Sequence, residues 1–221
     1  MTIVPGDAAG LRRAAGVLDA GVPVVMPLPS PLPYGLAGTN AANVNAAKGR
    51  PAGQTTGMLV ADIALVVPYA ELGAHSWAFV RWLATEQMMN LLLPIREGSP
   101  AWAKPSTSQG WLGVTAACLA EMRVLLDQRG LLYVSSANRT GGQVAVTAPT
   151  ANAAFADQLL VIDGDPFRDP AAFSGSATML RVERRGGLSL VRHGIHDAGF
   201  AGGTDQFLQH LTRLWRASTR S

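Results

Sequence analysis

Short apolar runs of strand type alternate with segments of helical spacing along this chain, and this alternation limits the possible folds more than any other feature. Helices are predicted at 8–20, 40–48, 71–84, 150–158 and 204–215, and strands at 22–26, 57–62, 89–95, 111–114, 131–134 and 159–162. Two further strands, 177–182 and 188–191, flank the turn Arg184-Arg185-Gly186-Gly187 as a hairpin. The pattern predicts an α/β fold in which a single domain has a twisted mixed sheet with flanking helices.

Two segments need separate treatment. Residues 27–33 carry a proline at every second position, which forbids a helix and removes ladder donors, so we expect an extended loop or an irregular edge there. Residues 114–126 are apolar with helical spacing and include Cys118, so we expect a helix that ends at Gly130.

The length of 221 residues is that of one domain. We expect this domain to span residues 1–200, with residues 201–221 forming an amphipathic helix that packs on it or extends it. The helical spacing places four apolar side chains on one face of that segment: Phe207, Leu211, Leu214 and Trp215.

Composition excludes several classes of protein. The chain is 48% hydrophobic and 15% charged, which is typical of a globular protein with a large interior. The net charge of +3 points neither to DNA nor to a membrane surface, and no apolar run is long enough to span a bilayer. Without a signal peptide, we expect a cytoplasmic protein.

Cysteine and histidine chemistry is not indicated. The single cysteine, Cys118, excludes an internal disulfide and a cysteine-cluster metal site, and an inert buried thiol is favoured over a catalytic one. His193 and His196 are close enough in sequence to share a site, but no third ligand stands at a convincing spacing. We therefore predict no metal bound by side chains.

Two clusters differ from the rest of the chain. Lys48-Gly49-Arg50-Pro51 places two cations across a helix C-terminus, where they either complement the helix dipole or bind a polyphosphate or carboxylates. Spacing alone weighs these two interpretations equally. The segment Ser135-Ser136-Ala137-Asn138-Arg139-Thr140-Gly141 follows the carboxyl end of an apolar strand, where ligands bind in α/β sheets, although an ordinary turn would look the same.

Together these clusters resemble the YrdC-like family of threonylcarbamoyl-AMP synthases, of which the chain looks like a diverged member. The resemblance runs from about residue 8 to residue 197. It rests on six stretches in the same order: Tyr34-Gly35-Leu36, Lys48-Gly49-Arg50-Pro51, Val60-Ala61-Asp62, Ser135 to Gly141, Ala177-Thr178, and Val191-Arg192-His193-Gly194.

The resemblance implies a reaction in which ATP, L-threonine and bicarbonate give threonylcarbamoyl-adenylate and pyrophosphate, for transfer to adenosine 37 of tRNA. It implies that Lys48 and Arg50 are catalytic and that they hold the phosphates with Ser136, Asn138 and Arg192. Magnesium would be held mainly by phosphate oxygens. The partners expected are small-molecule substrates and tRNA or tRNA-modification proteins, but neither a membrane nor DNA.

The departures from the family pattern lie on the amino-acid side of the site, which the resemblance places at Ser30, Leu32 and Tyr34. Leu32 stands in a segment that has lost the family's acidic residue and second threonine. Thr115 replaces a usual arginine, Ala177 replaces a usual serine, and the family's tryptophan-proline-glycine-proline segment is missing around 85–90. We therefore expect nucleotide binding to be kept more readily than selectivity for threonine.

Two other functions remain open. One is a related synthase in a specialised pathway that makes a different carbamoyl-adenylate from another amine. The other, from a different class, is a non-catalytic RNA-binding module, which needs cations spread along a surface.

Overall fold

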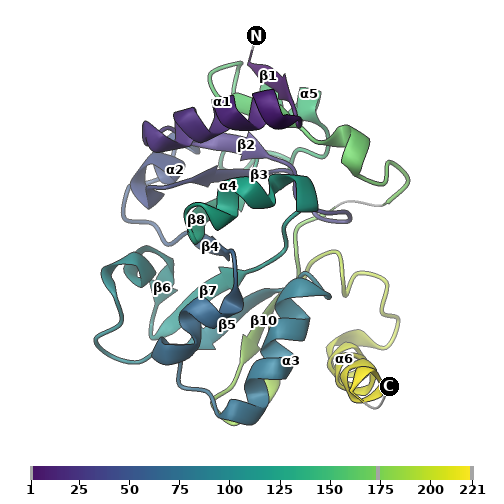
Figure 1. Cartoon of the computed structure of the whole chain (residues 1–221). Helices are drawn as coiled ribbons and strands as arrows, with labels where there is room; N and C mark the ends of the chain where they lie inside the picture. The colour runs from purple at the N-terminus through teal and green to yellow at the C-terminus, as the bar shows by residue number, and fades with distance from the viewer. Residues whose placement is uncertain (1, 173–174, 220–221) are drawn as a thin grey trace.

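The computed structural model describes residues 2–172 and 175–219, and its main feature is a long twisted sheet that passes through the whole molecule (Figure 1). The strand order is β1-β9-β2-β3-β8-β4-β7-β5-β10-β11, with β6 paired to β7. Parallel pairs such as β4 with β7 stand beside antiparallel pairs such as β4 with β8, so the sheet is mixed as predicted. The predicted α/β fold with flanking helices is confirmed.

The strands are short, and their bounds agree with the predicted runs to within a few residues. In chain order they are β1 (Ile3–Pro5), β2 (Val24–Met26), β3 (Gly35–Gly38), β4 (Gly57–Val60), β5 (Asn90–Pro94), β6 (Thr107–Ser108), β7 (Trp111–Thr115), β8 (Leu131–Ser136), β9 (Leu160–Asp163), β10 (Met179–Val182) and β11 (Leu188–Arg192). The sequence pattern did not predict β1, β3 and β6.

The helices are α1 (Ala8–Asp19), α2 (Ala41–Ala47), α3 (Ala74–Thr85), α4 (Arg123–Asp127), α5 (Ala148–Ala154) and α6 (Gly203–Ser218). Capping fixes where several of them start. The Asp7 carboxylate accepts hydrogen bonds from the backbone N–H groups of Ala9 and Gly10, and the Asn40 side chain does the same at the start of α2.

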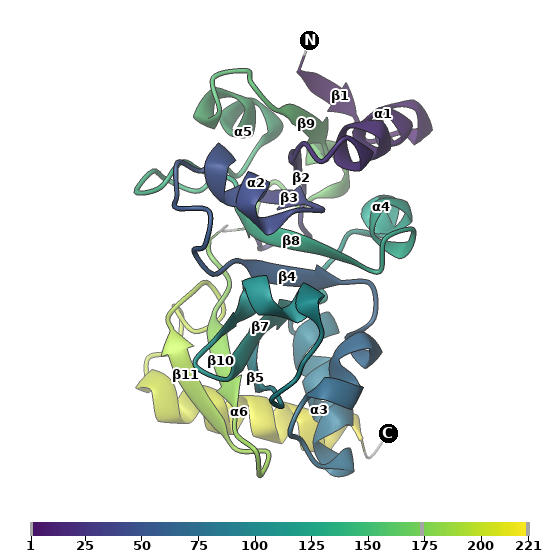
Figure 2. The same ribbon diagram turned by 90° about the vertical axis from the view of Figure 1, so that its left-hand side faces the viewer.

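Helices cover both faces of the half of the sheet that runs from β1 to β8. On one face, α1 and α4 pack on β2, β9 and β8 through buried residues such as Leu18, Met26 and Leu126. On the other face, α2 and α5 pack through Val44, Leu36 and Ala151. Figure 2 shows these helix pairs on opposite sides of the strands.

The other half of the sheet, from β4 to β11, is covered by helices on one face. Leu91, Leu112 and Leu180 from three neighbouring strands bury their side chains against α3, the 3-10 helix at Ile63–Tyr69, and α6. Because side chains alternate along a strand, the residues between these leucines point to the opposite face. That second face carries a cavity that is lined by residues of several strands.

The C-terminal helix packs on this core. Phe207 and Leu211 are each 2% exposed, and the Trp215 ring lies 5.6 Å from that of Phe79 on α3. Leu214, which the pattern placed on the same face, is 39% exposed, so this part of the apolar face is only partly covered. The predicted boundary at residue 200 falls shortly before α6, and the division into 1–200 and 201–221 stays a prediction.

The helix predicted at 114–126 is wrong in its first half. Strand β7 extends through Thr115 because it pairs with both β4 and β5, and helical structure starts only at the 3-10 turn Ala120–Met122. Cys118 therefore lies in the connecting segment. Burial raises the pKa of its thiol to about 11, as expected for an inert side chain.

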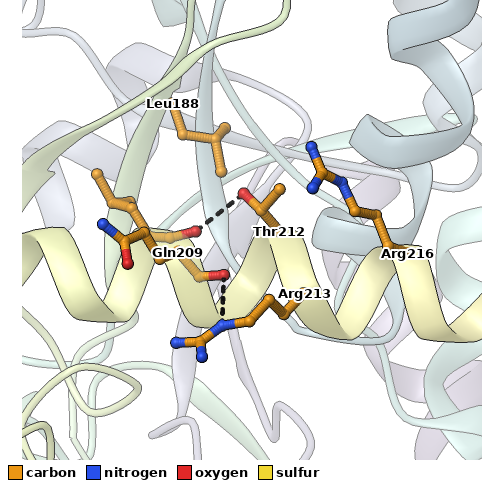
Figure 3. A pocket seen from close by; sticks show the side chains of 6 residues that line it. Leu188, Gln209, Thr212, Arg213 and Arg216 are labelled. Atoms are coloured by element: carbon orange, nitrogen blue, oxygen red, sulfur yellow. Dashed lines mark hydrogen bonds between the residues drawn. The ribbon is translucent and has the colours of Figure 1, made fainter.

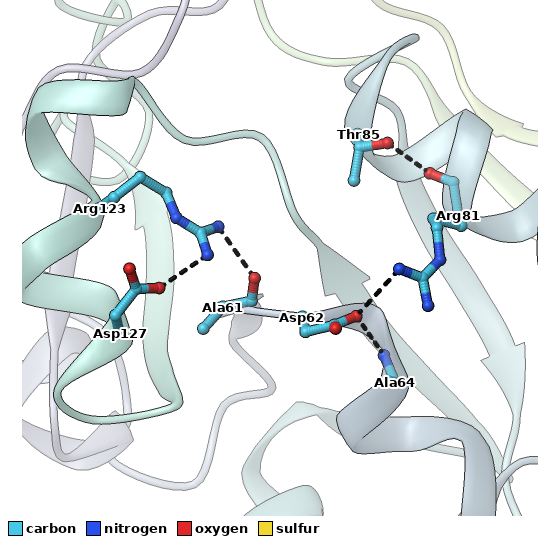
Figure 4. Close-up of polar contacts among 7 residues, drawn as sticks. All are labelled: Ala61, Asp62, Ala64, Arg81, Thr85, Arg123 and Asp127. Carbon is cyan, nitrogen blue, oxygen red and sulfur yellow. Dashed lines mark hydrogen bonds and ion pairs between the residues drawn. The ribbon is translucent and has the colours of Figure 1, made fainter.

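The end of β4 is held by hydrogen bonds and one ion pair (Figure 4). Arg123 Nη1 donates to the Ala61 carbonyl at 2.9 Å, and Arg81 Nη1 lies 3.7 Å from the Asp62 carboxylate. Asp62 also accepts from the Ala64 N–H at 2.8 Å. The stretch Val60-Ala61-Asp62 thus connects α3 and α4 to the sheet.

Across residues 2–172 and 175–219, none of the helices has both the length and the apolar character needed to cross a membrane.

Candidate functional site

A cavity of about 400 Å³ lies over the uncovered face of β7, β5 and β10 and reaches the ends of β8 and β4. This volume is in the range of small-ligand pockets. Its floor includes Gly113, Thr115 and Leu92, and its walls come from the proline-rich segment, the β8 end and the late hairpin. Segments far apart in the sequence therefore meet at one place.

Arg50 enters the cavity from the turn after α2. Gly49, at φ +70°, provides the left-handed residue that ends the helix, and Arg50 follows it. Arg50 Nη1 donates to the Ser135 hydroxyl at 3.2 Å, and Arg50 Nε donates to the Thr140 hydroxyl at 3.3 Å. Neutral partners hold this guanidinium in place and leave its charge uncompensated.

Arg192 reaches the cavity from the end of β11, and Arg192 Nη2 donates to the Ala177 carbonyl at 3.1 Å. The loop that follows is fixed by Asp197, which is buried. Its carboxylate accepts from the Thr178 hydroxyl at 2.6 Å, the Gly194 N–H at 2.8 Å and His193 Nδ1 at 2.5 Å. Although burial raises the pKa of Asp197, these hydrogen bonds outweigh it and hold that pKa below its usual value.

Arg181, on β10, is a cavity residue to which the sequence analysis gave no role. Its guanidinium lies 4.5 Å from the centre of the Trp111 ring, and both residues line the cavity. The signal was present, because alternation within the hairpin splits its arginines between two faces. Arg184, by contrast, is exposed and forms an ion pair with Glu71.

The cavity is strongly cationic. Arg50, Arg181 and Arg192 line it, and no aspartate or glutamate does so among the described residues. These residues also contain no group of three His, Cys, Asp or Glu side chains that could hold a metal ion. An anionic ligand therefore fits this cavity, and a metal ion would need oxygen ligands from that ligand.

Lys48 lies behind the cavity wall and does not line the cavity. Its side chain is 1% exposed, and Nζ donates to the carbonyls of Ser136 and Asn138 and to the Asn138 amide oxygen. Burial, followed by the nearby charge of Arg50, lowers its pKa to about 8. The catalytic role given to Lys48 stays a prediction, and its contacts are those of a residue that positions the 135–140 loop.

Ser136 and Asn138 have different surroundings in the structure. Ser136 lines the cavity, whereas Asn138 is buried and uses its side chain within the loop. Asn138 Oδ1 accepts from the Ser136 hydroxyl at 2.6 Å, and Asn138 Nδ2 donates to the Gly142 carbonyl at 2.7 Å. Asn138 thus shapes the loop that carries Ser135 and Ser136, and direct contact between Asn138 and phosphate stays a prediction.

The three predicted amino-acid-binding residues also differ in position. Leu32 and Tyr34 line the cavity, but Ser30 does not, and its hydroxyl accepts from the Asp169 N–H at 3.1 Å. The Tyr34 hydroxyl donates to Asp165 at 2.7 Å, and burial together with this hydrogen bond raises its pKa. Leu32 packs with Ala177 in a small apolar cluster, so this wall offers the ligand mainly apolar contact.

A second, shallower depression of about 450 Å³ lies between α6 and β11 (Figure 3). Apart from Leu188, the side chains that line it come from α6, and Arg213 Nε donates to the carbonyl of Gln209 within the same helix. Its polar groups therefore do not converge from separate segments, unlike those of the cavity on the sheet.

Comparison with solved structures identifies the fold. P. abyssi Sua5 complexed with L-threonine has a TM-score of 0.65 and 19% identity, over 88% of this chain and 58% of that chain. E. coli YciO has a TM-score of 0.63 and 12% identity, over 87% of this chain and 94% of that chain. This chain has the fold of Sua5 and YciO. The predicted resemblance to the YrdC-like family is therefore confirmed at the level of the fold.

A third solved structure with this fold is full-length HypF in its phosphate- and nucleotide-bound form, with a TM-score of 0.59 and 15% identity over 84% of this chain and 29% of that chain. No protein-family model and no curated protein sequence matches this chain. The chain spans about 58% of the Sua5 structure, and the Sua5-like fold alone does not specify a reaction.

Proposed function

We propose that this protein is an ATP-dependent synthase that converts an amine, bicarbonate and ATP into a carbamoyl-adenylate and pyrophosphate. The proposal rests on the cavity that Arg50, Arg181 and Arg192 line. No carboxylate among the described residues lines this cavity. The Sua5-like fold supports it, because Sua5 was solved with L-threonine and HypF with phosphate and nucleotide.

The chemistry needs positioning more than a protein nucleophile. The amine nitrogen bonds to the bicarbonate carbon with loss of water, and a carbamate oxygen then attacks the α-phosphorus of ATP. The bond from that phosphorus to the bridging oxygen of pyrophosphate breaks, and pyrophosphate leaves with the electron pair. Both reactants are anions, so arginines that bring them together and offset their repulsion supply the main catalytic effect.

Individual residues take the following roles in this proposal. Arg50 binds phosphate oxygens from a position fixed by Ser135 and Thr140, and Arg192 binds them from the hairpin side. The hydroxyl of Ser135, which accepts from Arg50, donates its own proton to the same oxygens. Mg²⁺ would lower the charge of the phosphates and would be held mainly by them, in keeping with the lack of carboxylates in the cavity.

The identity of the amine is a separate question. Leu32 and Ala177 make the wall beside Tyr34 apolar, which favours an amine other than threonine, as in a related synthase of a specialised pathway. If threonine is the amine, the product is threonylcarbamoyl-adenylate and tRNA is the final acceptor.

Pyrophosphate release in the presence of ATP, bicarbonate and pooled amino acids tests the proposal. Release that requires both co-substrates and falls at least tenfold in Arg50→Ala supports it. The matched control is Arg185→Ala, on the exposed hairpin turn. Absence of release from the wild-type protein, together with salt-sensitive retention of RNA, would instead favour a non-catalytic RNA-binding module.

A further inference from the structure

Strand β11 is an open edge of the sheet. The strand order ends at β1 on one side and at β11 on the other, and among the described strands β11 pairs with β10 alone (Figure 2). Strand β1 has three residues and includes Pro5, which has no N–H to donate, whereas β11 has five residues and no proline. An edge of the second kind can accept a further strand.

The hydrogen bonds of the hairpin show which groups of β11 face outward. The Glu183 N–H donates to the Gly187 carbonyl at 2.8 Å, so these two residues form a hydrogen-bonded pair. The next pair along the hairpin, Val182 with Leu188, is therefore a non-hydrogen-bonded pair. By the same alternation, the backbone N–H and C=O groups of Leu188 and Leu190 point away from β10. Within residues 2–172 and 175–219, these groups have no backbone partner.

The depression between α6 and β11 lies beside this edge. Leu188 is its one lining residue from a described strand, and the Leu188 side chain points toward α6 (Figure 3). Helix α6 contributes Leu208 and the exposed residues Arg213 and Arg216, whose side chains leave the helix in different directions. No aspartate or glutamate among the described residues lines the depression. Its apolar and cationic groups are thus spread along a helix, which suits an extended segment better than one small anion.

A strand added to β11 would place side chains in this depression. In an antiparallel pair, residues that lie opposite each other point their side chains to the same face of the sheet. Leu188 and Leu190 pack on the core that α6 covers, so residues paired with them also point to the α6 side. In this mode of recognition, main-chain hydrogen bonds supply affinity and the pockets for alternate side chains supply specificity.

The charge of the surface distinguishes between the possible occupants. A second copy of this chain brings the same arginines to the interface and leaves their charge uncompensated. Carboxylate side chains offset this charge and form hydrogen bonds with guanidinium groups. The phosphates of RNA also offset it, but they accept hydrogen bonds and cannot donate to the outward carbonyls of Leu188 and Leu190.

We propose that β11 and the depression beside it bind an extended acidic segment of a partner protein, which adds to the sheet as an antiparallel strand. The segment carries acidic residues at alternate positions, where they face Arg213 and Arg216. This inference does not depend on the proposed function, because the depression and the cavity share no lining residue.

The probe is the peptide acetyl-Thr-Glu-Thr-Val-Thr-Glu-Thr-amide, in which alternate positions give one face with glutamate and valine and one face with threonine. Two matched peptides carry one N-methyl group each. In one it is on the central valine, whose N–H faces β11, and in the other on the following threonine, whose N–H faces away. A fourth peptide has lysine in place of both glutamates. Calorimetric titration into the whole protein measures each affinity.

The double variant Arg213→Ala with Arg216→Ala removes the cations of the depression. Arg12→Ala with Arg185→Ala is the matched control, because both arginines are exposed and neither lines the depression. We expect the first double variant, the lysine peptide and the N-methylvaline peptide each to lose about tenfold or more in affinity. The control variant and the N-methylthreonine peptide should change the affinity by less than about threefold.

Hydrogen exchange followed by NMR locates the bound peptide. The N–H groups of Leu188 and Leu190 should exchange about tenfold more slowly when the acidic peptide binds, and that of Ser189, which faces β10, should change less. No binding of the acidic peptide, equal binding of the lysine peptide, or equal effects of the two N-methyl groups would each overturn the inference. Protection of the Leu188 and Leu190 N–H groups in a peptide-free dimer, or by RNA, would overturn it in favour of that occupant.

Discussion

Lys48 and the cavity arginines are cations in two contrasting environments, although Lys48 and Arg50 are only two residues apart. Lys48 is buried, and four oxygens of the 136–138 segment surround its ammonium group. The arginines have one or two neutral partners or, for Arg181, an unpartnered Nε. A cation whose donors are satisfied by the backbone stabilises the fold, whereas a cation left partly unsatisfied in a cavity is available to a ligand.

Replacement of Lys48 by methionine should produce the largest loss of stability. The substitution leaves the buried carbonyls of Ser136 and Asn138 without their donor, so we expect the free energy of unfolding to fall on the order of 3 kcal/mol. Urea unfolding followed by circular dichroism measures this change. The matched control is Lys104→Met, at the exposed second lysine, which should change the value by less than about 0.5 kcal/mol. A loss in Lys48→Met that is no larger than the loss in Lys104→Met would show that Lys48 does not stabilise the fold.

Replacement of Arg50 by alanine should lower the affinity for nucleotide and leave the stability almost unchanged. Because its partners are the hydroxyls of Ser135 and Thr140 at the cavity edge, we expect little change in stability but a loss of about 10–100-fold in affinity for a non-hydrolysable ATP analogue. Calorimetric titration measures the affinity, and Arg185→Ala controls for the loss of one positive charge. Unchanged affinity in Arg50→Ala would remove this residue from the nucleotide site.

Asp197 links a structural role to the cavity, because its buried carboxylate holds the loop that follows the cavity residue Arg192. Asparagine has nearly the same shape, but its NH₂ group cannot accept from the Thr178 hydroxyl, the Gly194 N–H and His193 together. We expect Asp197→Asn to lose about 1–2 kcal/mol in urea unfolding. Asp127→Asn, which breaks only an exposed pair with Arg123, should lose less than about 0.5 kcal/mol. If the two variants are equally stable, the Asp197 hydrogen bonds do not hold the loop.

The same contrast explains how far the sequence could predict this site. Arg50 and Arg192 were identified because their motifs resemble those of a family, and the hairpin was identified from its turn residues. Lys48 and Arg50 belong to one tetrapeptide at the end of a helix, and the sequence does not show which of the two side chains points into the protein and which into the cavity. The buried position of Lys48 therefore could not be predicted. Arg181 was not identified as a cavity residue because the ring it packs against, that of Trp111, is 70 residues away in the sequence and meets it only in the folded sheet.

The smallest expected effect is a pH dependence of stability that comes from the Lys48 side chain. Burial lowers the Lys48 pKa to about 8 in the folded state, from an ordinary value of 10.5. Between these two values the unfolded chain binds more protons at this group than the folded chain, so this group makes the free energy of unfolding rise with pH across that window.

We therefore expect the difference in unfolding free energy between wild type and Lys48→Met to grow by about 1 kcal/mol from pH 7.5 to pH 9.0. Urea unfolding at the two pH values measures it, and the difference between wild type and Lys104→Met should stay constant, because Lys104 is exposed. A wild-type advantage that shrinks as the pH rises would mean that the ammonium form of Lys48 is favoured in the folded protein. In that case the carbonyls of Ser136 and Asn138 stabilise the charge by more than burial costs.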